Sequence, residues 1–192
     1  MLDISNTAVV IIDVQGKLAT LMHEKEDLYR NLQILVKGAL VLELPVLWLE
    51  QYPEGLGPTI PEVSELLKGQ EPLEKTCFSA CGQSDFVLQL DDSGCKHVLV
   101  AGIETHICVY QTTRDLLDQG YVVEVIYDAV SSRSSDNKRI GIEKIRAGGA
   151  AILARGEDQE IRPTSYCCAR GKDPLGRIGG VVRQGIAGQV MG

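Results

Sequence analysis

The chain has 192 residues, of which 44% are hydrophobic and 23% are charged, a balance typical of one globular domain with a sizeable core. Its 26 acidic residues outnumber 19 lysines and arginines, which gives a formal net charge of −7. Such a surface repels the phosphate backbone of nucleic acids, so we expect no nucleic-acid partner. No apolar run is long enough to cross a membrane, and the first residues do not form a signal peptide, so we expect no membrane partner and a cytoplasmic protein.

Four short, apolar, β-branched runs alternate with amphipathic segments of helical length. The runs, which predict strands, are residues 8–13, 44–50, 97–102 and 121–128. The segments that predict helices are residues 27–43, 84–91, 105–119 and 136–147. Runs that are apolar on both faces indicate a parallel sheet covered by helices. We therefore predict an α/β fold that is three-layered and Rossmann-like, with a mostly parallel sheet of about six strands and helices on both faces.

The composition changes from about Arg155 onward. Eight of the last 38 residues are glycine, and neither helical nor strand periodicity is sustained there. We therefore divide the chain into a folded domain over residues 1–154 and an irregular C-terminal arm of the same domain over residues 155–192. Genuine divergence would explain such an arm, and so would a change of reading frame in the gene.

Several polar residues follow the predicted strands directly. Asp13, Glu50 and the turn from Gly102 to Cys108 each come at the carboxyl end of a strand. In an open parallel sheet, ligands bind beyond these ends, so the three segments are expected to converge on one crevice. The loop 51–61, which is rich in Pro and Gly, either covers this crevice or simply connects two elements.

Cys108 is the candidate nucleophile because it lies where a strand gives way to a helix. Free N–H groups and the helix dipole at such a position lower the pKa of a thiol and can hold an oxyanion. The alternative is a buried core cysteine, since free cysteine often packs as a small hydrophobic residue. His106 precedes Cys108 by two residues and would point away from the thiol on a helix, so a cysteine–histidine dyad is disfavoured.

Asp13 is the better candidate for a base. It follows five apolar residues, and partial burial there would raise the pKa of its carboxyl group. Its alternative role is to cap the helix that follows. Lys75 would supply a positive charge that favours a thiolate, although most lysines are solvated surface residues.

The six cysteines are too few for a disulfide scaffold in a chain of this length, so reduced thiols are expected. Cys77 and Cys81 have three residues between them, but no matching Cys or His pair follows downstream. A structural zinc site is therefore not expected at these two cysteines.

Four segments, taken together, resemble the isochorismatase-like cysteine hydrolase superfamily, and loop 50–59 is similar to its uncharacterised isochorismatase domain-containing branch. The segments are Ile11-Ile-Asp-Val-Gln15, Lys75-Thr-Cys-Phe-Ser-Ala80, Gly102-Ile-Glu-Thr-His-Ile-Cys108 and Tyr127-Asp-Ala-Val-Ser-Ser-Arg133. The resemblance covers residues 6–154 and implies a catalytic triad of Asp13, Lys75 and Cys108. It also implies a cis peptide between Ile103 and Glu104, and an oxyanion hole formed by the backbone N–H groups of Glu104 and Cys108.

The resemblance further implies a homo-oligomeric hydrolase that cleaves a small amide-like C–N bond through a thioester-type intermediate. Nicotinamidases of this superfamily carry a zinc-binding Asp-x-His motif, but the corresponding segment here is Glu50-Gln-Tyr52, so no metal and no other cofactor are expected. The partner is expected to be a small-molecule substrate, with Gln15, Tyr52 and Phe78 as its contacts. A binding or scaffold protein with the same fold and no catalysis is the alternative, and the intact triad favours the enzyme.

Overall fold

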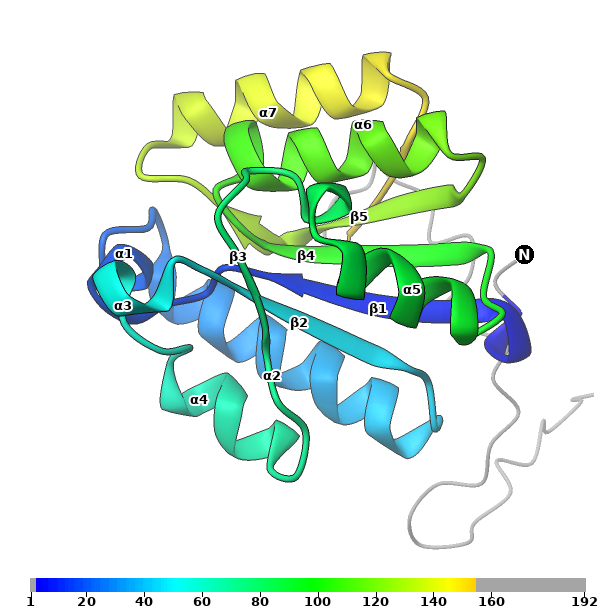
Figure 1. The fold of residues 1–192 in the computed structure, drawn as a ribbon. Helices are drawn as coiled ribbons and strands as arrows, with labels where there is room; N and C mark the ends of the chain where they lie inside the picture. Colours follow the sequence, from blue (N-terminus) through cyan, green and yellow to red (C-terminus); the bar gives the residue numbers. More distant parts are fainter. Residues whose placement is uncertain (1–2, 155–192) are drawn as a thin grey trace, which may run out of the picture.

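A computed structural model of the chain describes residues 3–154 and shows one six-stranded sheet (Figure 1). The strands are β1 (Thr7–Ile12), β2 (Val46–Gln51), β3 (Leu73–Lys75), β4 (His97–Ile103), β5 (Val122–Ser131) and β6 (Ala151–Leu153). They lie in the order β3-β2-β1-β4-β5-β6, and every neighbouring pair is parallel. This is the strand order of a Rossmann fold, so the predicted fold class is confirmed.

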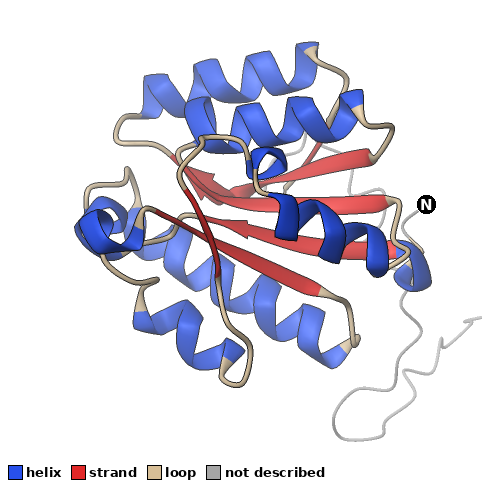
Figure 2. Cartoon of the chain, in the orientation of Figure 1, coloured by secondary structure: helices blue, strands red, loops and turns tan. Residues whose placement is uncertain are grey.

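Helices cover both faces of the sheet (Figure 2). The helices are α1 (Gly16–Thr20), α2 (Lys25–Val41), α3 (Pro53–Leu56), α4 (Pro61–Ser64), α5 (Ser84–Asp92), α6 (Tyr110–Asp118) and α7 (Ser135–Ala147). Short turns of 3₁₀ helix are η1 (Ile4–Asn6), η2 (Glu65–Leu67) and η3 (Ala80–Gly82), and η4 (Thr105–Val109) is a π-helical turn. Helices α5, α6 and α7 pack on one face, and α2 and α4 pack on the other.

The central strand β1 explains why the sequence reads as an unbroken apolar run. All six of its residues are buried, and successive side chains point to opposite faces. Val10 and Ile12 enter the core beneath α5, α6 and α7, whereas Val9 and Ile11 enter the core beneath α2 and α4. A strand between two helical layers must be apolar at every position, and its first polar residue then falls at the edge of the sheet.

Two details differ from the sequence-based expectation. The predicted helix over residues 105–119 is the π-helical turn η4 followed by α6, so Cys108 lies in a π turn and not in the first turn of an α-helix. Strands β3 and β6 have no counterpart among the four apolar runs, because each has three residues and neither is fully buried.

The predicted C-terminal arm lies outside the described residues. Within residues 3–154, no helix combines the length and apolar character needed to cross a lipid bilayer.

Gly102 sets the spacing between the two strands that carry Asp13 and the Cys108 turn. It is the register partner of Ile12, and its φ of +118° lies in the region that favours glycine. A Cβ atom at this position would lie 2.1 Å from the carbonyl oxygen of Ile12. Only glycine therefore permits β1 and β4 to approach this closely at the carboxyl edge of the sheet.

The substitution Gly102→Ala is expected to lower the free energy of unfolding by about 3 kcal/mol or more, because it combines a backbone clash with an unfavourable φ. The matched control is Gly38→Ala in α2, where a Cβ atom meets nothing within 4 Å and the helix gains about 0.5–1 kcal/mol. Denaturant unfolding of the two variants measures both effects. Equal stabilities would contradict the proposed close approach of β1 and β4.

Candidate active site

The three candidate catalytic residues lie at the carboxyl edge of the sheet. Asp13 follows the central strand β1, Lys75 ends the edge strand β3, and Cys108 lies in the turn η4 after β4. Strands β1 and β4 are the neighbours at which the chain changes direction across the sheet, which is where ligands bind in folds of this kind. The three residues have exposed fractions of 1%, 3% and 8%, respectively. The sheet therefore brings three reactive side chains to one nearly closed site.

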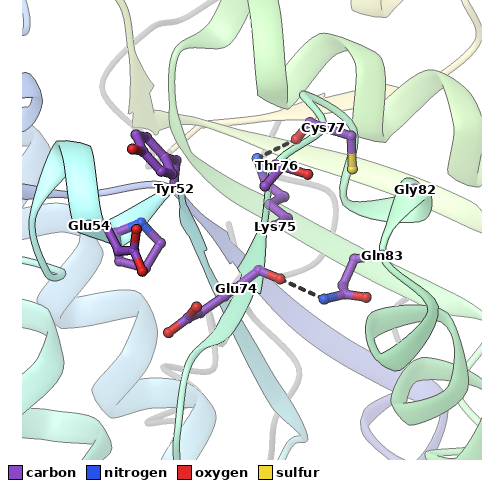
Figure 3. A pocket seen from close by; sticks show the side chains of 9 residues that line it. Tyr52, Glu54, Glu74, Lys75, Thr76, Cys77, Gly82 and Gln83 are labelled. Atoms are coloured by element: carbon purple, nitrogen blue, oxygen red, sulfur yellow. Dashed lines mark hydrogen bonds between the residues drawn. The ribbon is translucent and has the colours of Figure 1, made fainter.

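A pocket of about 490 Å³ borders this site at Lys75, the last residue of β3 (Figure 3). Its lining residues are Tyr52, Pro53, Glu54, Glu74, Lys75, Thr76, Cys77, Gly82 and Gln83. Tyr52 and Glu54 lie on one side, and Cys77 and Gln83 lie on the other. Lys75 is the one candidate catalytic residue that lines this pocket, and its side chain is fully buried.

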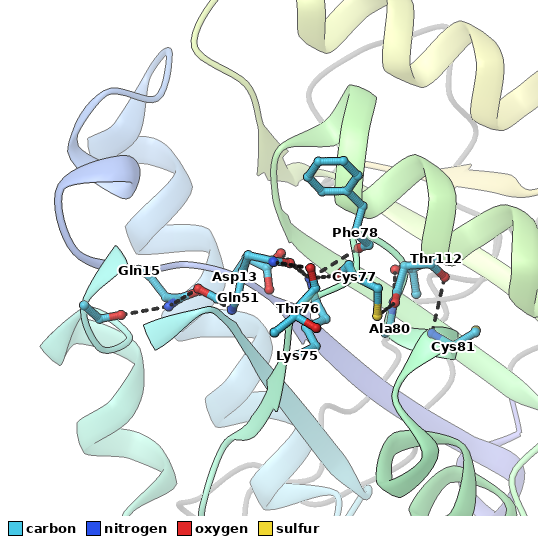
Figure 4. A network of polar contacts seen from close by, with 12 residues as sticks. Asp13, Gln15, Gln51, Lys75, Thr76, Cys77, Phe78, Ala80, Cys81 and Thr112 are labelled. Atoms are coloured by element: carbon cyan, nitrogen blue, oxygen red, sulfur yellow. Dashed lines mark hydrogen bonds and ion pairs between the residues drawn. The ribbon is translucent and has the colours of Figure 1, made fainter. Parts of the chain in front are cut away.

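Lys75 is a buried lysine whose ammonium has four acceptors (Figure 4). Its Nζ lies 2.7 Å from Asp13 Oδ2 and 2.7 Å from Gln51 Oε1. The backbone oxygens of Cys77 and Phe78 each lie at 3.2 Å. The alternative of a solvated surface lysine is wrong, because no part of this side chain is exposed.

Asp13 uses its carboxylate for Lys75 and not for a helix terminus. Helix α1 begins at Gly16 with Gln15 at the N-cap position, so the alternative role of Asp13 as a helix cap is wrong. The φ of Asp13 is 53°, and its N–H donates to the Leu49 carbonyl at 3.1 Å. The backbone therefore turns sharply at the end of β1 and directs the carboxylate into the site.

Burial raises the pKa of Asp13, as the sequence predicted, and the charge and hydrogen bond of Lys75 oppose this rise. The Cys108 thiol also lowers the pKa of Asp13, whereas the Glu50 carboxylate raises it. Oxygen Oδ1 of Asp13 is buried and has no partner at hydrogen-bonding distance in the described part of the chain, although the thiol is near enough to affect the carboxylate. Asp13 thus has one oxygen bound to Lys75 and one able to accept a proton.

Burial raises the pKa of the Cys108 thiol to about 12, and the negative charge of Asp13 contributes to the rise. Lys75 lowers this pKa but does not outweigh the other two effects. The expectation that a helix start would lower the pKa is therefore wrong, because desolvation and the neighbouring carboxylate exceed any help from backbone N–H groups. The sulfur is a neutral thiol at neutral pH, and it needs a base to become a nucleophile.

The peptide between Ile103 and Glu104 is cis, as the family resemblance implied. The Glu104 N–H donates no hydrogen bond to another backbone group among residues 3–154. The Glu104 carboxylate is buried and accepts a hydrogen bond from the backbone N–H of Arg133 at 3.1 Å. The His106 Nδ1 atom lies 3.0 Å from Ser132 Oγ, so this ring is bound to a serine and not to the thiol.

The three expected substrate contacts have different environments. Gln15 is fully buried, and its amide binds the backbone of Gln51 and Gly57, so its expected role as a substrate contact is corrected to a structural one. Tyr52 and Phe78 have exposed fractions of 53% and 55%. Tyr52 lines the pocket, and the Phe78 carbonyl binds Lys75. Both remain available to a ligand.

Two polar residues end β2. Sequence reasoning placed Glu50 at the crevice without giving it a role, and it missed Gln51 as a site residue. Gln51 binds the Lys75 ammonium, and Glu50 Oε1 accepts a hydrogen bond from the Thr59 N–H at 2.6 Å. The available signal for Gln51 was its position, because it comes directly after Glu50 at the end of a buried strand. In the described residues, no three His, Cys, Asp or Glu side chains are grouped closely enough to hold a metal ion, and the expected absence of zinc stays a prediction.

Comparison with known proteins places the chain among related sequences and structures. The model of the isochorismatase domain matches residues 7–157. The chain is 36% identical over 155 residues to "Isochorismatase family protein 1A" of Dictyostelium discoideum, with 77% of this chain and 74% of that protein covered. The structure of MAR1 ribonuclease from Caenorhabditis elegans is similar with a TM-score of 0.72 and 34% identity, covering 80% of this chain and 79% of the other. YcaC from Pseudomonas aeruginosa, with hexane-2,5-diol and covalent acrylamide, gives a TM-score of 0.76 and 25% identity, covering 80% and 78%.

Opposite shifts of the Cys108 pKa are expected when each of its two charged neighbours is removed. Asp13→Asn removes the negative charge that raises this pKa, so the pKa should fall below about 12. Lys75→Met removes the positive charge that lowers the pKa, so it should rise above that value. The pH dependence of iodoacetamide labelling at Cys108, followed by peptide mass mapping, measures both shifts.

Cys81 is the internal control for this experiment. Its pKa is raised to about 11 by burial, and the other groups that shift it do not include Asp13 or Lys75. Its labelling profile should stay the same in both variants. A shift of Cys108 in the same direction in both variants, or an equal shift of Cys81, would show that these three residues do not form one electrostatic unit.

Proposed function

The chain belongs to the isochorismatase-like hydrolase family, and from this premise we propose that it is a metal-independent cysteine hydrolase acting on a small amide. The observation that carries the proposal is the buried contact between Lys75 and Asp13 beside the Cys108 thiol. An ion pair on the surface would not support the proposal, since exposed ion pairs are common and contribute little to stability. A buried pair next to a buried thiol supplies the base and the positive charge that a cysteine nucleophile requires.

In the first step, the Asp13 carboxylate takes the proton of the Cys108 thiol while the sulfur attacks the carbonyl carbon of the substrate. The backbone N–H groups of Glu104 and Cys108 are proposed to hold the resulting oxyanion. The C–N bond then breaks, and protonated Asp13 returns the proton to the departing ammonia or amine. Water attacks the thioester in turn, which releases the carboxylic acid and restores the thiol.

This sequence suits a buried site because it creates no net charge. Before the proton moves, the charges are those of the Asp13 carboxylate and the Lys75 ammonium. After it moves, they are those of the Cys108 thiolate and the same ammonium. Formation of an additional isolated charge in a desolvated site would be very unfavourable, whereas this exchange transfers one negative charge between two neighbours of Lys75.

We propose Tyr52 and Phe78 as substrate contacts, because both are exposed beside the Lys75 segment. The adjoining pocket of about 490 Å³ is within the size range of small-molecule sites. The covalent acrylamide on the P. aeruginosa relative suggests acrylamide as a probe, because this molecule combines a primary amide with an alkene that reacts with thiols. We also propose a homo-oligomer, as the family resemblance implies, and light scattering tests this assembly.

A panel of small primary and secondary amides, assayed for release of ammonia or amine, tests the proposed reaction. The variant Cys108→Ala is expected to lower kcat/KM by about 10³-fold or more, since it removes the nucleophile. Cys95→Ala is the matched control, because Cys95 is also buried but precedes β4 at the opposite end of the sheet. Acrylamide should add its mass to Cys108 in the parent protein.

Hydrolysis that survives in Cys108→Ala, or acrylamide labelling that does not favour Cys108 over Cys95, would overturn the proposal. RNA is included as a separate substrate because three structural neighbours carry the name MAR1 ribonuclease. The net charge of −7 opposes RNA binding, so no cleavage is expected. RNA cleavage that requires Cys108 would show that the proposed substrate class is wrong.

A further inference from the structure

Gln51 has a fixed contact with the Lys75 ammonium. It is the last residue of β2 and the register partner of Lys75 on β3. Its Oε1 atom accepts a hydrogen bond from Lys75 Nζ at 2.7 Å, and its Nε2 atom donates to the Thr76 carbonyl at 2.9 Å. An ammonium only donates and a carbonyl only accepts, so these two contacts determine the orientation of the carboxamide.

The backbone of Gln51 is held by a second glutamine. Its N–H donates to Gln15 Oε1 at 2.6 Å, and its carbonyl accepts from Gln15 Nε2 at 3.1 Å. The same Nε2 atom donates to the Gly57 carbonyl at 2.7 Å, and the Gln15 side chain is fully buried. Both backbone groups and both side-chain polar atoms of Gln51 therefore have partners, and the residue is held in one position.

We propose that Gln51 is a positioning residue that keeps the Lys75 ammonium in place when Asp13 loses its charge. This inference rests on the proposed function, in which the Cys108 proton moves to Asp13. Protonation of Asp13 weakens the strongest contact of Lys75, and the remaining acceptors are Gln51 Oε1 and the carbonyls of Cys77 and Phe78.

Gln51 is the one side chain among these three neutral acceptors, and it provides the shortest contact. Because it carries no charge, it binds the ammonium without competing electrostatically with the new thiolate. A charged carboxylate at the same position would retain the contact but would oppose a second negative charge nearby. The neutral amide therefore stabilises the thiolate state indirectly, through the position of Lys75.

The test is the pH dependence of iodoacetamide labelling at Cys108, which needs no substrate. Gln51→Met removes the acceptor at similar side-chain length and is expected to raise the apparent pKa by about one unit, which corresponds to roughly tenfold slower labelling at fixed pH. Gln51→Glu keeps the shape and an acceptor but adds a negative charge, so it should also raise the pKa. A native profile in Gln51→Glu would show that residue 51 has no electrostatic effect on the thiol.

Two controls separate a specific effect from general loosening. Asn31→Leu removes a carboxamide whose Nδ2 donates to the Asp128 carbonyl on β5 and does not contact Lys75, so the profile should stay native. In the double variant Lys75→Met/Gln51→Met, the pKa should equal that of Lys75→Met alone, because Gln51 acts through the lysine. Circular dichroism establishes that each variant is folded.

Lys75→Met is measured first, because it distinguishes this inference from the proposed function. An unchanged profile in Lys75→Met overturns the proposed function and this inference with it. A raised pKa in Lys75→Met with a native profile in Gln51→Met, or with additive shifts in the double variant, overturns the role of Gln51 alone. If Gln51→Met does not fold, a native labelling profile in Gln51→Glu overturns the role of Gln51 instead.

Discussion

The buried ammonium of Lys75 is the constraint on which the site depends. A charge without exposed surface destabilises a protein strongly unless acceptors surround it, and here four oxygen atoms do so. They come from the end of β1, the end of β2 and the loop after β3. The ammonium therefore fixes three segments relative to one another, and the strand order that places β2 between β1 and β3 makes this possible.

The same arrangement is consistent with the proposed role of Cys108 as a nucleophile, although its thiol has a pKa of about 12. Asp13 and Lys75 shift the Cys108 pKa in opposite directions. While the Asp13 carboxylate is charged, the thiol stays neutral. In the proposed reaction the carboxylate takes the thiol proton, and Lys75 then stabilises the thiolate. Reactivity is thereby coupled to proton transfer within the site. Exposed cysteines with a low pKa lack this coupling and react with any electrophile that reaches them.

The sequence predicted the positions of Asp13 and Cys108 well because both follow strands that are buried on two faces. Such strands are continuous apolar runs, and the first polar or reactive residue marks the sheet edge. Lys75 ends a three-residue strand without an apolar run, so periodicity gave no sign of it. Its charge made it a candidate, and the family resemblance implied its place in the triad. The π turn was also beyond prediction, since it depends on tertiary contact: a Cβ at Gly141 of α7 would lie 2.8 Å from the His106 nitrogen.

Gln15 shows why contacts between distant segments limit sequence-based site prediction. Its position two residues after Asp13 placed it correctly at the sheet edge, but its polar groups turn to the backbone of Gln51 and Gly57, over 35 residues away. The next loop residues are fixed in the same way, because Thr59 pairs with Gln15 and donates its N–H to Glu50. Glu50 in turn raises the pKa of Asp13. The loop after β2 thus supports the lysine through its contacts with Gln15 and Gln51, and it affects the proposed base Asp13 through Glu50. Its conformation and the electrostatics of the site therefore depend on each other.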